Sequence, residues 1–432
     1  MSSEYTMLPL GAVAKVRSGY AFKSLDMGTE GHPVIKIGNI EPPLVQIKDC
    51  DRISSDVVRK TPSSGRYVLC EGDILIAMTG ATAGKTGRFP ATNEVCYLNQ
   101  RVGKVYLTDG SLIDYNYLYQ VLSRQDFADE ILLLADGSAQ GNVSGALIET
   151  YEIPIPPSTI QKAIAYILGT LDDKIELNRK TNETLEAMAK ALFKSWFVDF
   201  DPVRAKAEGR PTGLPDEISD LFPDSFEESE LGEIPSGWEA GCLSDCCEIT
   251  MGQSPPGDTY NEAGDGLPFY QGKTDFGFRF PGRRVYCSAP TRQASIGATL
   301  ISVRAPVGSV NIAREVCSIG RGIAALKSRH SADSFVYYLV GTLQRVFESY
   351  NSEGTVFGAI NGKDLASIQI VAPSTEAIAA FNSQCLPMDE SIQSNTLETE
   401  YLTTIRDALL PKLISGEIRI PDAERMLEEV GV

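Results

Sequence analysis

The sequence contains few histidines and few tryptophans. Two of its 432 residues are His and two are Trp. With only His32 and His330 available, mechanisms that rely on histidine bases or histidine metal ligands find little support. No Ser/His/Asp or Cys/His arrangement stands out along the chain, so both histidines are interpreted as ordinary surface or packing residues.

Long hydrophobic runs are also absent. Runs such as residues 131–135 have the length of a core segment, not that of a membrane span. The start, MSSEYTMLPL, has neither a basic n-region nor a long apolar stretch, so we expect no signal peptide. The nine cysteines are irregularly spaced, and the cluster Cys242, Cys246 and Cys247 has no second pair at zinc-site spacing. We therefore expect reduced thiols in a cytoplasmic protein without a membrane partner.

An excess of basic residues is missing as well, since the formal net charge is −18. The acidic residues are concentrated in two regions. Residues 198–236 carry 3 basic and 11 acidic side chains, and residues 374–432 carry 4 and 11. The blocks 1–156 and 237–373 are close to neutral, so each could present a basic face to a polyanion.

The stretch TGATAGKT at residues 79–86 follows an apolar run, as a nucleotide-binding P-loop would. Its spacing is wrong, because only three residues separate Gly80 from Gly84-Lys85-Thr86, where a P-loop has four. The continuation Gly87-Arg88-Phe89-Pro90 also argues against the helix that should face the phosphates. A P-loop-like NTPase remains an alternative. A polar turn that contacts a ligand, or a plain surface hairpin, fits better.

The strongest signal is an internal repeat. Thirteen residues between positions 137 and 192 recur 217 positions later, among them Asp172, which recurs as Asp389. Looser matches extend the repeat toward the N-terminus, with Gly72-x-x-Leu75-Ile76 matching Gly297-x-x-Leu300-Ile301. The chain is thus one block followed by a helix, written twice. Short apolar runs broken by Gly, Pro and Asn indicate strands, and helical spacing indicates helices over residues 112–134 and 333–350.

The second half of residues 158–196 and its counterpart in the second copy carry a heptad pattern. The predicted seam comprises Leu171, Ile175, Asn178, Leu185, Leu192, Ile392, Asn395, Leu402 and Leu409. A seam Asn lowers stability but fixes register and pairing. Two such helices can pair antiparallel, and about 25 paired residues span roughly 37 Å at ~1.5 Å per residue. One turn of B-DNA is about 34–36 Å long, so two blocks held that far apart suit two half-sites. The alternative is that each helix is a single amphipathic helix packed on its own block.

Several stretches make the chain resemble the specificity subunit of type I restriction–modification systems. They are residues 137–197 (GSAQGNVSGALIETYEIPIPPSTIQKAIAYILGTLDDKIELNRKTNETLEAMAKALFKSWF), LGEIPSGWE at 231–239, PSTEAIAAF, and ALLPKLISGEI at 408–418. The resemblance implies an α+β fold with two mixed α/β target recognition domains, separated by two long antiparallel helices that form a coiled-coil spacer with pseudo-two-fold repeat symmetry. The expected parts are recognition domain 1 (1–156), central helix (157–197), acidic connector (198–236), recognition domain 2 (237–373), C-terminal helix (374–416) and tail (417–432).

The same resemblance implies a non-catalytic, DNA-reading subunit of a bacterial or archaeal complex. Each recognition domain would read one half of a bipartite, asymmetric site in double-stranded DNA. The helices would set the gap and dock two modification (adenine methyltransferase) subunits, and restriction (translocase and nuclease) subunits would join that core. S-adenosylmethionine, ATP and Mg²⁺ would belong to those partners, with no cofactor in this chain. The acidic connector is either a solvated linker or a partner-docking segment. A coiled-coil scaffold without DNA contact is the third alternative.

Candidate DNA contacts are chosen by side-chain chemistry, because Arg, Gln and Asn can bond base edges and Lys can bond phosphates. For each single residue a surface or structural role is the alternative. The candidates are Lys85, Thr86, Arg88, Gln100, Arg101, Gln140 and Asn142 in the first block, and Lys273, Arg279, Arg283, Arg284, Arg304, Asn311, Arg314 and Arg321 in the second.

Overall fold

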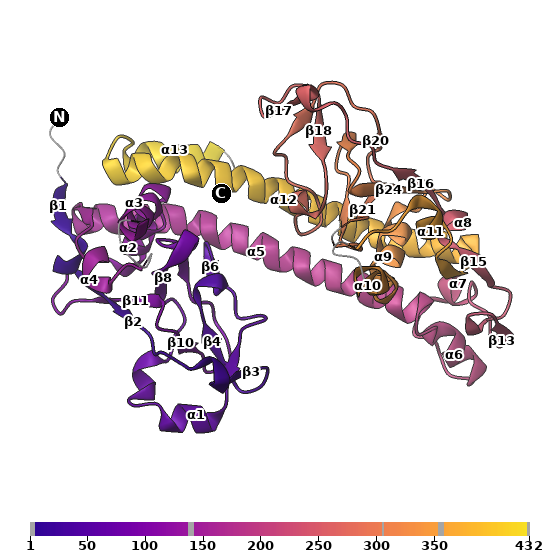
Figure 1. Ribbon diagram of the computed structural model, residues 1–432, viewed down its shortest axis with the longest axis horizontal. Coiled ribbons are helices and arrows are strands. Elements are labelled where there is room, and N and C mark those ends of the chain that lie inside the picture. The colour runs from indigo at the N-terminus through magenta and orange to yellow at the C-terminus, as the bar shows by residue number, and fades with distance from the viewer. Residues whose placement is uncertain (1–4, 137–141, 305, 353–357, 430–432) are drawn as a thin grey trace. The chain divides into compact units, whose positions relative to one another are not determined.

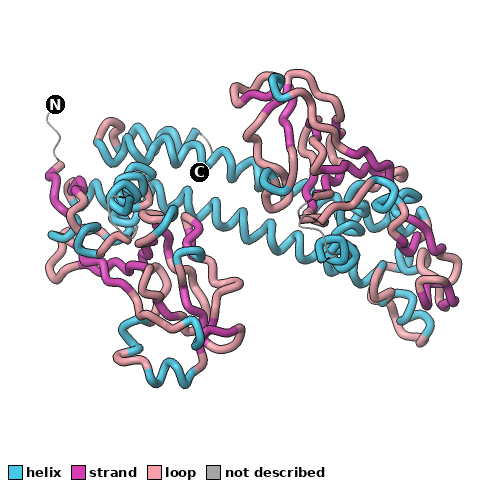
Figure 2. Tube along the Cα trace, in the orientation of Figure 1, coloured by secondary structure: helices cyan, strands magenta, loops and turns pink. Residues whose placement is uncertain are grey.

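The computed structural model describes residues 5–136, 142–304, 306–352 and 358–429 (Figure 1). The chain divides into two compact units. Unit 1 comprises Met1–Arg179 and Leu397–Val432, and unit 2 comprises Lys180–Thr396. Each unit joins a strand-rich block to segments of two long helices (Figure 2).

Unit 1 contains two main sheets and one strand pair. The six-stranded sheet has the order β2 (Ala14–Ser18), β11 (Val102–Leu107), β8 (Ile74–Ala77), β9 (Thr86–Arg88), β6 (Leu44–Val45), β5 (Ile40–Glu41). The four-stranded sheet has the order β10 (Tyr97–Leu98), β4 (His32–Ile35), β7 (Arg52–Ile53), β3 (Met27–Gly28). β1 (Thr6–Pro9) pairs with β12 (Glu152–Ile155). The short helices are α1 (Ser55–Lys60), α2 (Tyr115–Leu122), α3 (Gln125–Asp136) and α4 (Gly145–Ile148).

Unit 2 has the corresponding parts. Its four-stranded sheet has the order β16 (Cys247–Met251), β24 (Ile323–Ser328), β21 (Thr299–Ser302), β22 (Val310–Ile312). Its five-stranded sheet has the order β17 (Tyr260–Asn261), β19 (Tyr286–Cys287), β18 (Leu267–Tyr270), β23 (Cys317–Ile319), β20 (Gln293–Ala294). β15 (Glu239–Cys242) pairs with β25 (Gln369–Ala372). The short helices of this block are α8 (Leu243–Cys246), α9 (Asp333–Thr342), α10 (Gln344–Ser352) and α11 (Gly362–Ala366).

The two units share several strand pairings, although their sheets differ in strand number. β1–β12 and β15–β25 are both antiparallel pairs, with Ile153 and Ile370, 217 positions apart, in the second strand of each. Both units also contain a parallel pair, β4–β10 in unit 1 and β18–β23 in unit 2, and unit 1 has a further one, β6–β9. The mixed α/β architecture predicted from the sequence repeat is therefore confirmed.

The two long helices are α5 (Ser158–Phe197) and α12 (Thr375–Ser415). In unit 1, Leu171 of α5 shares a hydrophobic core with Leu402 and Leu409 of α12. In unit 2, Phe193 of α5 shares a core with Phe381 of α12, their rings 5.3 Å apart. Within unit 1, Asp172 contacts Arg406 and Asn178 contacts Glu398, and within unit 2, Asn182 contacts Asn395 and Phe193 contacts Phe381, so in each unit the paired segments are antiparallel. After α12, α13 (Ile420–Glu429) buries Ala423 and Leu427 in the core of unit 1.

The connector is folded, which contradicts the solvated-linker alternative. It forms α6 (Asp201–Ala207), α7 (Asp216–Ser219) and the hairpin β13 (Phe226–Ser229)–β14 (Gly232–Pro235). Phe222 is 2% exposed and meets Trp196 edge to face at 5.2 Å. The aromatic residues of the connector thus pack into the core of unit 2, although the connector as a whole is strongly acidic.

The helix expected over residues 112–134 is two helices, α2 and α3. The break falls at Ser123, whose hydroxyl donates to the carbonyl of Gln120 at 3.0 Å and so satisfies an end carbonyl of α2. The stretch 333–350 is likewise split into α9 and α10. Apolar spacing marked the right region but could not show where the chain bends.

The TGATAGKT stretch is a hairpin, so the P-loop alternative fails on geometry. β8 is followed by one short turn and then by β9, which pairs antiparallel with β8. The amide of Gly84 donates to the carbonyl of Ala77 at 2.9 Å, and the amide of Ala77 donates to the carbonyl of Lys85. Gly84 has φ +85°, and an added Cβ would lie 2.7 Å from the Ala128 backbone. The glycines thus serve the turn and its packing.

Candidate nucleic-acid interface

In unit 1 the exposed candidates gather at the C-terminal end of β8. The Met78 amide donates to the carbonyl of Arg101 at 3.0 Å, and Ala77 is bonded to Lys85 as described above. Thr79 forms a bridge with Asn142. Lys85, Arg101, Asn142 and the neighbouring Gln100 are all exposed. We call these four residues the β8-end cluster. Gln140 lies outside the described residues.

Unit 2 has an equivalent cluster at the end of β21. The Val303 amide donates to Gly322, the residue after Arg321, at 2.8 Å, and Arg304 forms a bridge with Ala359. Arg304 and Arg321 are both exposed. Arg321 matches Gln100 in the repeat, so the same surface position carries different hydrogen-bonding groups in the two copies. We call these two arginines the β21-end cluster.

A second group in unit 2 lies on the segment 271–284. Lys273, Arg283 and Arg284 are exposed. The guanidinium of Arg284 donates to the buried carboxylate of Asp275 at 2.9 Å, and Arg283 donates to Glu315 at 2.6 Å. Arg284 and Asp275 line a cavity of about 300 Å³ together with Gln271 and the stacked pair Tyr260–Phe269. The surroundings of Arg284 thus hold its exposed donors in a defined direction. Side-chain chemistry predicted Arg284 as a candidate from the sequence but did not predict its partner Asp275.

Three candidates are corrected because their side chains are buried. Thr86 is 3% exposed and its hydroxyl donates to the carbonyl of Gly84 at 3.1 Å. Asn311 is 1% exposed, and its amide donates to Gly277 at 3.0 Å and to Val310 at 2.8 Å. Arg279 is also 1% exposed. None of the three is available to a duplex at the surface of its unit.

Two further arginines are partly buried. Arg88 donates to Asn116 at 2.9 Å, and its guanidinium lies 4.2 Å from the ring centre of Tyr119. Arg314 lies 5.9 Å from the ring centre of Phe280. Stacking over an aromatic ring stabilises each guanidinium in its observed position. These two residues therefore pack within their units.

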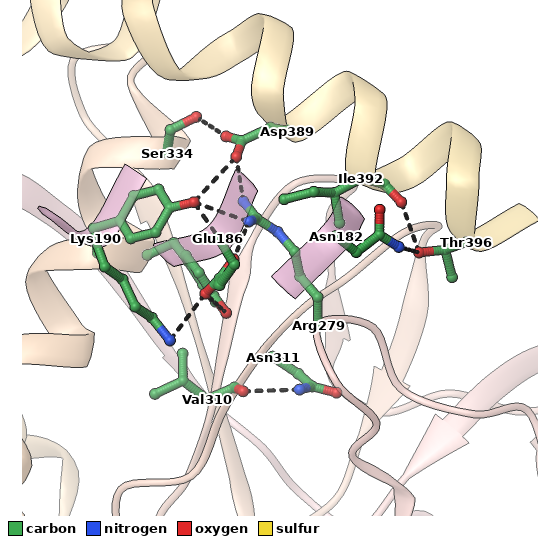
Figure 3. Close-up of polar contacts among 12 residues, drawn as sticks. Asn182, Glu186, Lys190, Arg279, Val310, Asn311, Ser334, Asp389, Ile392 and Thr396 are labelled. Atoms are coloured by element: carbon green, nitrogen blue, oxygen red, sulfur yellow. Dashed lines mark hydrogen bonds and ion pairs between the residues drawn. The ribbon is translucent and has the colours of Figure 1, made fainter. Parts of the chain in front are cut away.

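Arg279 is the centre of a buried charge cluster in unit 2 (Figure 3). Its Nη1 donates to Glu186 of α5 and, at 2.9 Å, to the hydroxyl of Tyr338, while its Nη2 donates to Asp389 of α12. Glu186 also pairs with Lys190 at 3.1 Å. Burial alone would lower the pKa of Arg279, but the facing carboxylates raise it, so this guanidinium stays charged. The two carboxylates were not predicted from the sequence, although the recurrence of Asp172 as Asp389 was a signal for one of them.

The predicted seam residues lie along the paired helices. Leu171, Ile175, Asn178, Ile392, Leu402 and Leu409 are buried, while Leu185, Leu192 and Asn395 are half-buried. In unit 1, Asn178 donates to Glu398 at 2.7 Å. In unit 2, the amide of Asn395 donates to Asn182 at 3.0 Å. The seam asparagines are therefore used for polar contacts between the helices, as the register argument expects.

Known proteins are similar to this chain over most of its length. A family model described as the type I restriction modification DNA specificity domain matches residues 2–187 and 235–384. The chain belongs to this type I restriction–modification specificity family. The MjaX specificity subunit of a type I restriction enzyme from Methanocaldococcus jannaschii is 31% identical over 398 residues, covering 90% of this chain and 88% of that protein. The HindI specificity subunit of Haemophilus influenzae is 27% identical, covering 84% and 90%.

The fold of this specificity chain is likewise shared with a solved structure. The crystal structure of the type I restriction–modification system S subunit from M. genitalium matches with a TM-score of 0.58 at 16% identity, covering 95% of this chain and 96% of that one. At that identity the likeness concerns the fold alone. The family model describes a DNA specificity domain, so the chain is a recognition component and not a catalytic one, and nothing favours the NTPase or scaffold alternatives. Within the described parts of the chain, no cluster of metal-ligand residues and no helix able to cross a membrane occurs.

Proposed function

We propose that this specificity subunit reads a bipartite, asymmetric DNA site, with one half assigned to each recognition domain. Residues 1–156 would read the first half through the β8-end cluster. Residues 237–373 would read the second half through the β21-end cluster and the exposed face of the segment 271–284.

The observation that carries the proposal is one fold occurring twice with different exposed side chains. At the matched position, Gln100 presents an amide, which suits adenine, and Arg321 presents a guanidinium, which suits guanine. The same strand framework underlies both residues. Two copies that differ at the reading surface predict two different half-sites.

The helix pair suits the role of a fixed spacer. α5 has 40 residues, so it is roughly 60 Å long at ~1.5 Å per residue. That exceeds one turn of B-DNA, about 34–36 Å. Polar pairs such as Asn178–Glu398 in unit 1 oppose sliding of one helix along the other, because a shifted register would leave these groups without partners. On this proposal the half-sites would be separated by a gap of fixed length.

Both long helices also keep apolar side chains at the surface. In unit 1, Tyr166 and Leu177 of α5 and Leu397 and Tyr401 of α12 are exposed, with Leu177 at 58%. Tyr166 and Leu177 are eleven residues apart and so share one helix face. We propose that these faces dock two modification subunits, which would bring S-adenosylmethionine, and that restriction subunits would bring ATP and Mg²⁺.

Reconstitution with the modification subunits tests this function. The chain and its partners are mixed with plasmid DNA and S-adenosylmethionine, and methylated adenines are mapped by sequencing. We expect methylation at one split sequence when the chain is present and none by the chain alone. Methyl transfer by the isolated chain, or a complete complex without sequence preference, would refute the proposal.

A further inference from the structure

We propose that Arg279 is a positioning residue, which holds the DNA-reading segment 271–284 at a fixed place on the helix pair of unit 2. This inference rests on the proposed function. One buried side chain would fix the position, relative to the helices, of the residues that read the second half-site.

The direction of the Arg279 side chain sets it apart within its segment. The sequence QGKTDFGFRFPGRR at residues 271–284 contains four basic residues. Lys273, Arg283 and Arg284 are exposed, whereas Arg279 is 1% exposed. One basic side chain of a surface segment is therefore directed inward, toward the long helices.

The inward contacts reach both helices from one guanidinium. Glu186 comes from α5 and Asp389 comes from α12, and each accepts a hydrogen bond from Arg279. The ring of Tyr337 of α9 lies 4.6 Å from the guanidinium carbon. A planar guanidinium can satisfy two carboxylates in fixed directions at once, which a lysine ammonium cannot do in the same way. Arg279 thus ties its segment to the helix pair in a defined orientation (Figure 3).

The segment is held by several hydrogen bonds between this anchor and the reading face. The carbonyl of Arg279 accepts from the Ile312 amide at 2.8 Å, and the Asn311 side chain both accepts from and donates to the backbone of Gly277. The Gly282 amide donates to the carbonyl of Asp275 at 2.8 Å. Asp275 then holds Arg284 through its carboxylate. These hydrogen bonds, joined by short stretches of backbone, therefore connect the helix pair to an exposed arginine.

Unit 1 supplies a natural contrast. Asp172, the repeat partner of Asp389, accepts a hydrogen bond at 3.0 Å from Arg406, which belongs to α12 itself. The loop at Pro43 is attached to unit 1 by a tyrosine instead: the carbonyl oxygen of Pro43 accepts a hydrogen bond from the Tyr119 hydroxyl at 3.0 Å. Arg406 therefore links the helices without carrying a reading segment, which makes it the matched control for Arg279.

The test uses the complete methyltransferase complex with full-length subunit. Methylome mapping first gives the wild-type site, and synthetic duplexes are then prepared with the native gap and with gaps one base pair shorter and longer. The variants are Arg279→Met, Arg279→Lys and the control Arg406→Met. The readout is the ratio of methylation rate at the native gap to that at the altered gaps. Hydrogen exchange of the amides of residues 274–284 is followed in the same complexes.

For Arg279→Met we expect the gap ratio to fall toward unity and exchange in 274–284 to accelerate, with Arg279→Lys between this variant and wild type. Arg406→Met should lower thermal stability and leave the gap ratio unchanged. An unchanged ratio in both Arg279 variants, an equal loss of methylation at every gap, or failure of both variants to assemble would overturn the positioning role. A wild-type complex without any gap preference would instead refute the proposed function itself.

Discussion

Asp172 and Asp389 occupy the same position in the two copies, yet each pairs with an arginine of different origin. Asp172 accepts from Arg406 of the long C-terminal helix, while Asp389 accepts from Arg279 of a recognition-domain segment. Duplication thus preserved the carboxylate while the positive partner changed. In unit 2 the contact joins the reading block to the helices, and in unit 1 it joins helix to helix.

Arg279→Met should strongly destabilise unit 2. Removing the guanidinium leaves the carboxylates of Glu186 and Asp389 buried near each other without their shared cation. Breaking a buried charge pair in this way costs about 3–5 kcal/mol. Urea denaturation of the full chain measures this loss. Arg283→Met, which breaks an exposed pair with Glu315, is the control and should change stability by about 0–1 kcal/mol.

The destabilisation by Arg279→Met should depend on pH. Burial raises the pKa of Asp389 above 3.8, while Arg279 and Ser334 lower it and Glu186 raises it. Without Arg279 the pKa rises further, so the native variant binds more protons than its unfolded state over a wider range above 3.8. The stability of the variant therefore falls as pH rises through this range. We expect a larger deficit relative to wild type at about pH 8 than at about pH 5. An equal deficit at both pH values would contradict this.

Asn182→Ala should weaken helix pairing in unit 2. The amide oxygen of Asn182 accepts from Asn395 at 3.0 Å, and its nitrogen donates to Thr396 at 3.3 Å. Leaving these groups without partners costs about 1–3 kcal/mol. Thermal unfolding checks the value. Ser391→Ala, at an exposed position of α12, should stay within about 0.5 kcal/mol of wild type.

Arg284→Ala should relax the second half-site at a single position. A guanidinium held by Asp275 can bond one guanine bidentately, a contact worth about 1–3 kcal/mol of discrimination. Lys273→Ala should instead lower methylation of all sequences alike, as loss of a phosphate contact does. Methylome mapping of both variants distinguishes them, and a shift in the first half-site would count against the assignment.

Leu177→Glu should impair assembly with the modification subunits. Its side chain is 58% exposed on α5, where a carboxylate would oppose burial in an apolar contact. Leu112→Glu, at a leucine that is 84% exposed and lies outside the long helices, is the matched control. Size-exclusion chromatography with the modification subunit should show loss of complex for the first variant alone. Equal assembly of both would place the docking surface elsewhere.

The fold was predictable because its signals are local or repeated. Identities at one constant offset indicate the duplication, and heptads ending near Trp196 outline α5. The folded connector was not predicted. Its acidic composition concealed Phe222, whose burial depends on Trp196 and Trp238 in other segments.

The site was less predictable, because burial depends on residues far along the chain. Arg279 belongs to a segment rich in basic and glycine residues, which suggests a surface position, yet it is buried by carboxylate partners 93 and 110 positions away. Thr86 and Asn311 have side chains suited to DNA contact, but Thr86 bonds the turn of its own hairpin and Asn311 bonds Gly277 in the segment 271–284. Side-chain chemistry can nominate contacts, whereas exposure depends on the tertiary fold.

Each copy should read its own half-site, and truncation after the first copy separates the two. A chain ending at Phe197 keeps the first block and α5, and its unit 1 core lacks Leu402 and Leu409 of α12. Because α5 and α12 are repeats, a second truncated chain can supply the missing helix. Methylated sites are mapped for complexes carrying the truncated and the full chain. The account predicts that the truncated chain reads the first half-site as an inverted repeat. An unchanged asymmetric site would contradict it.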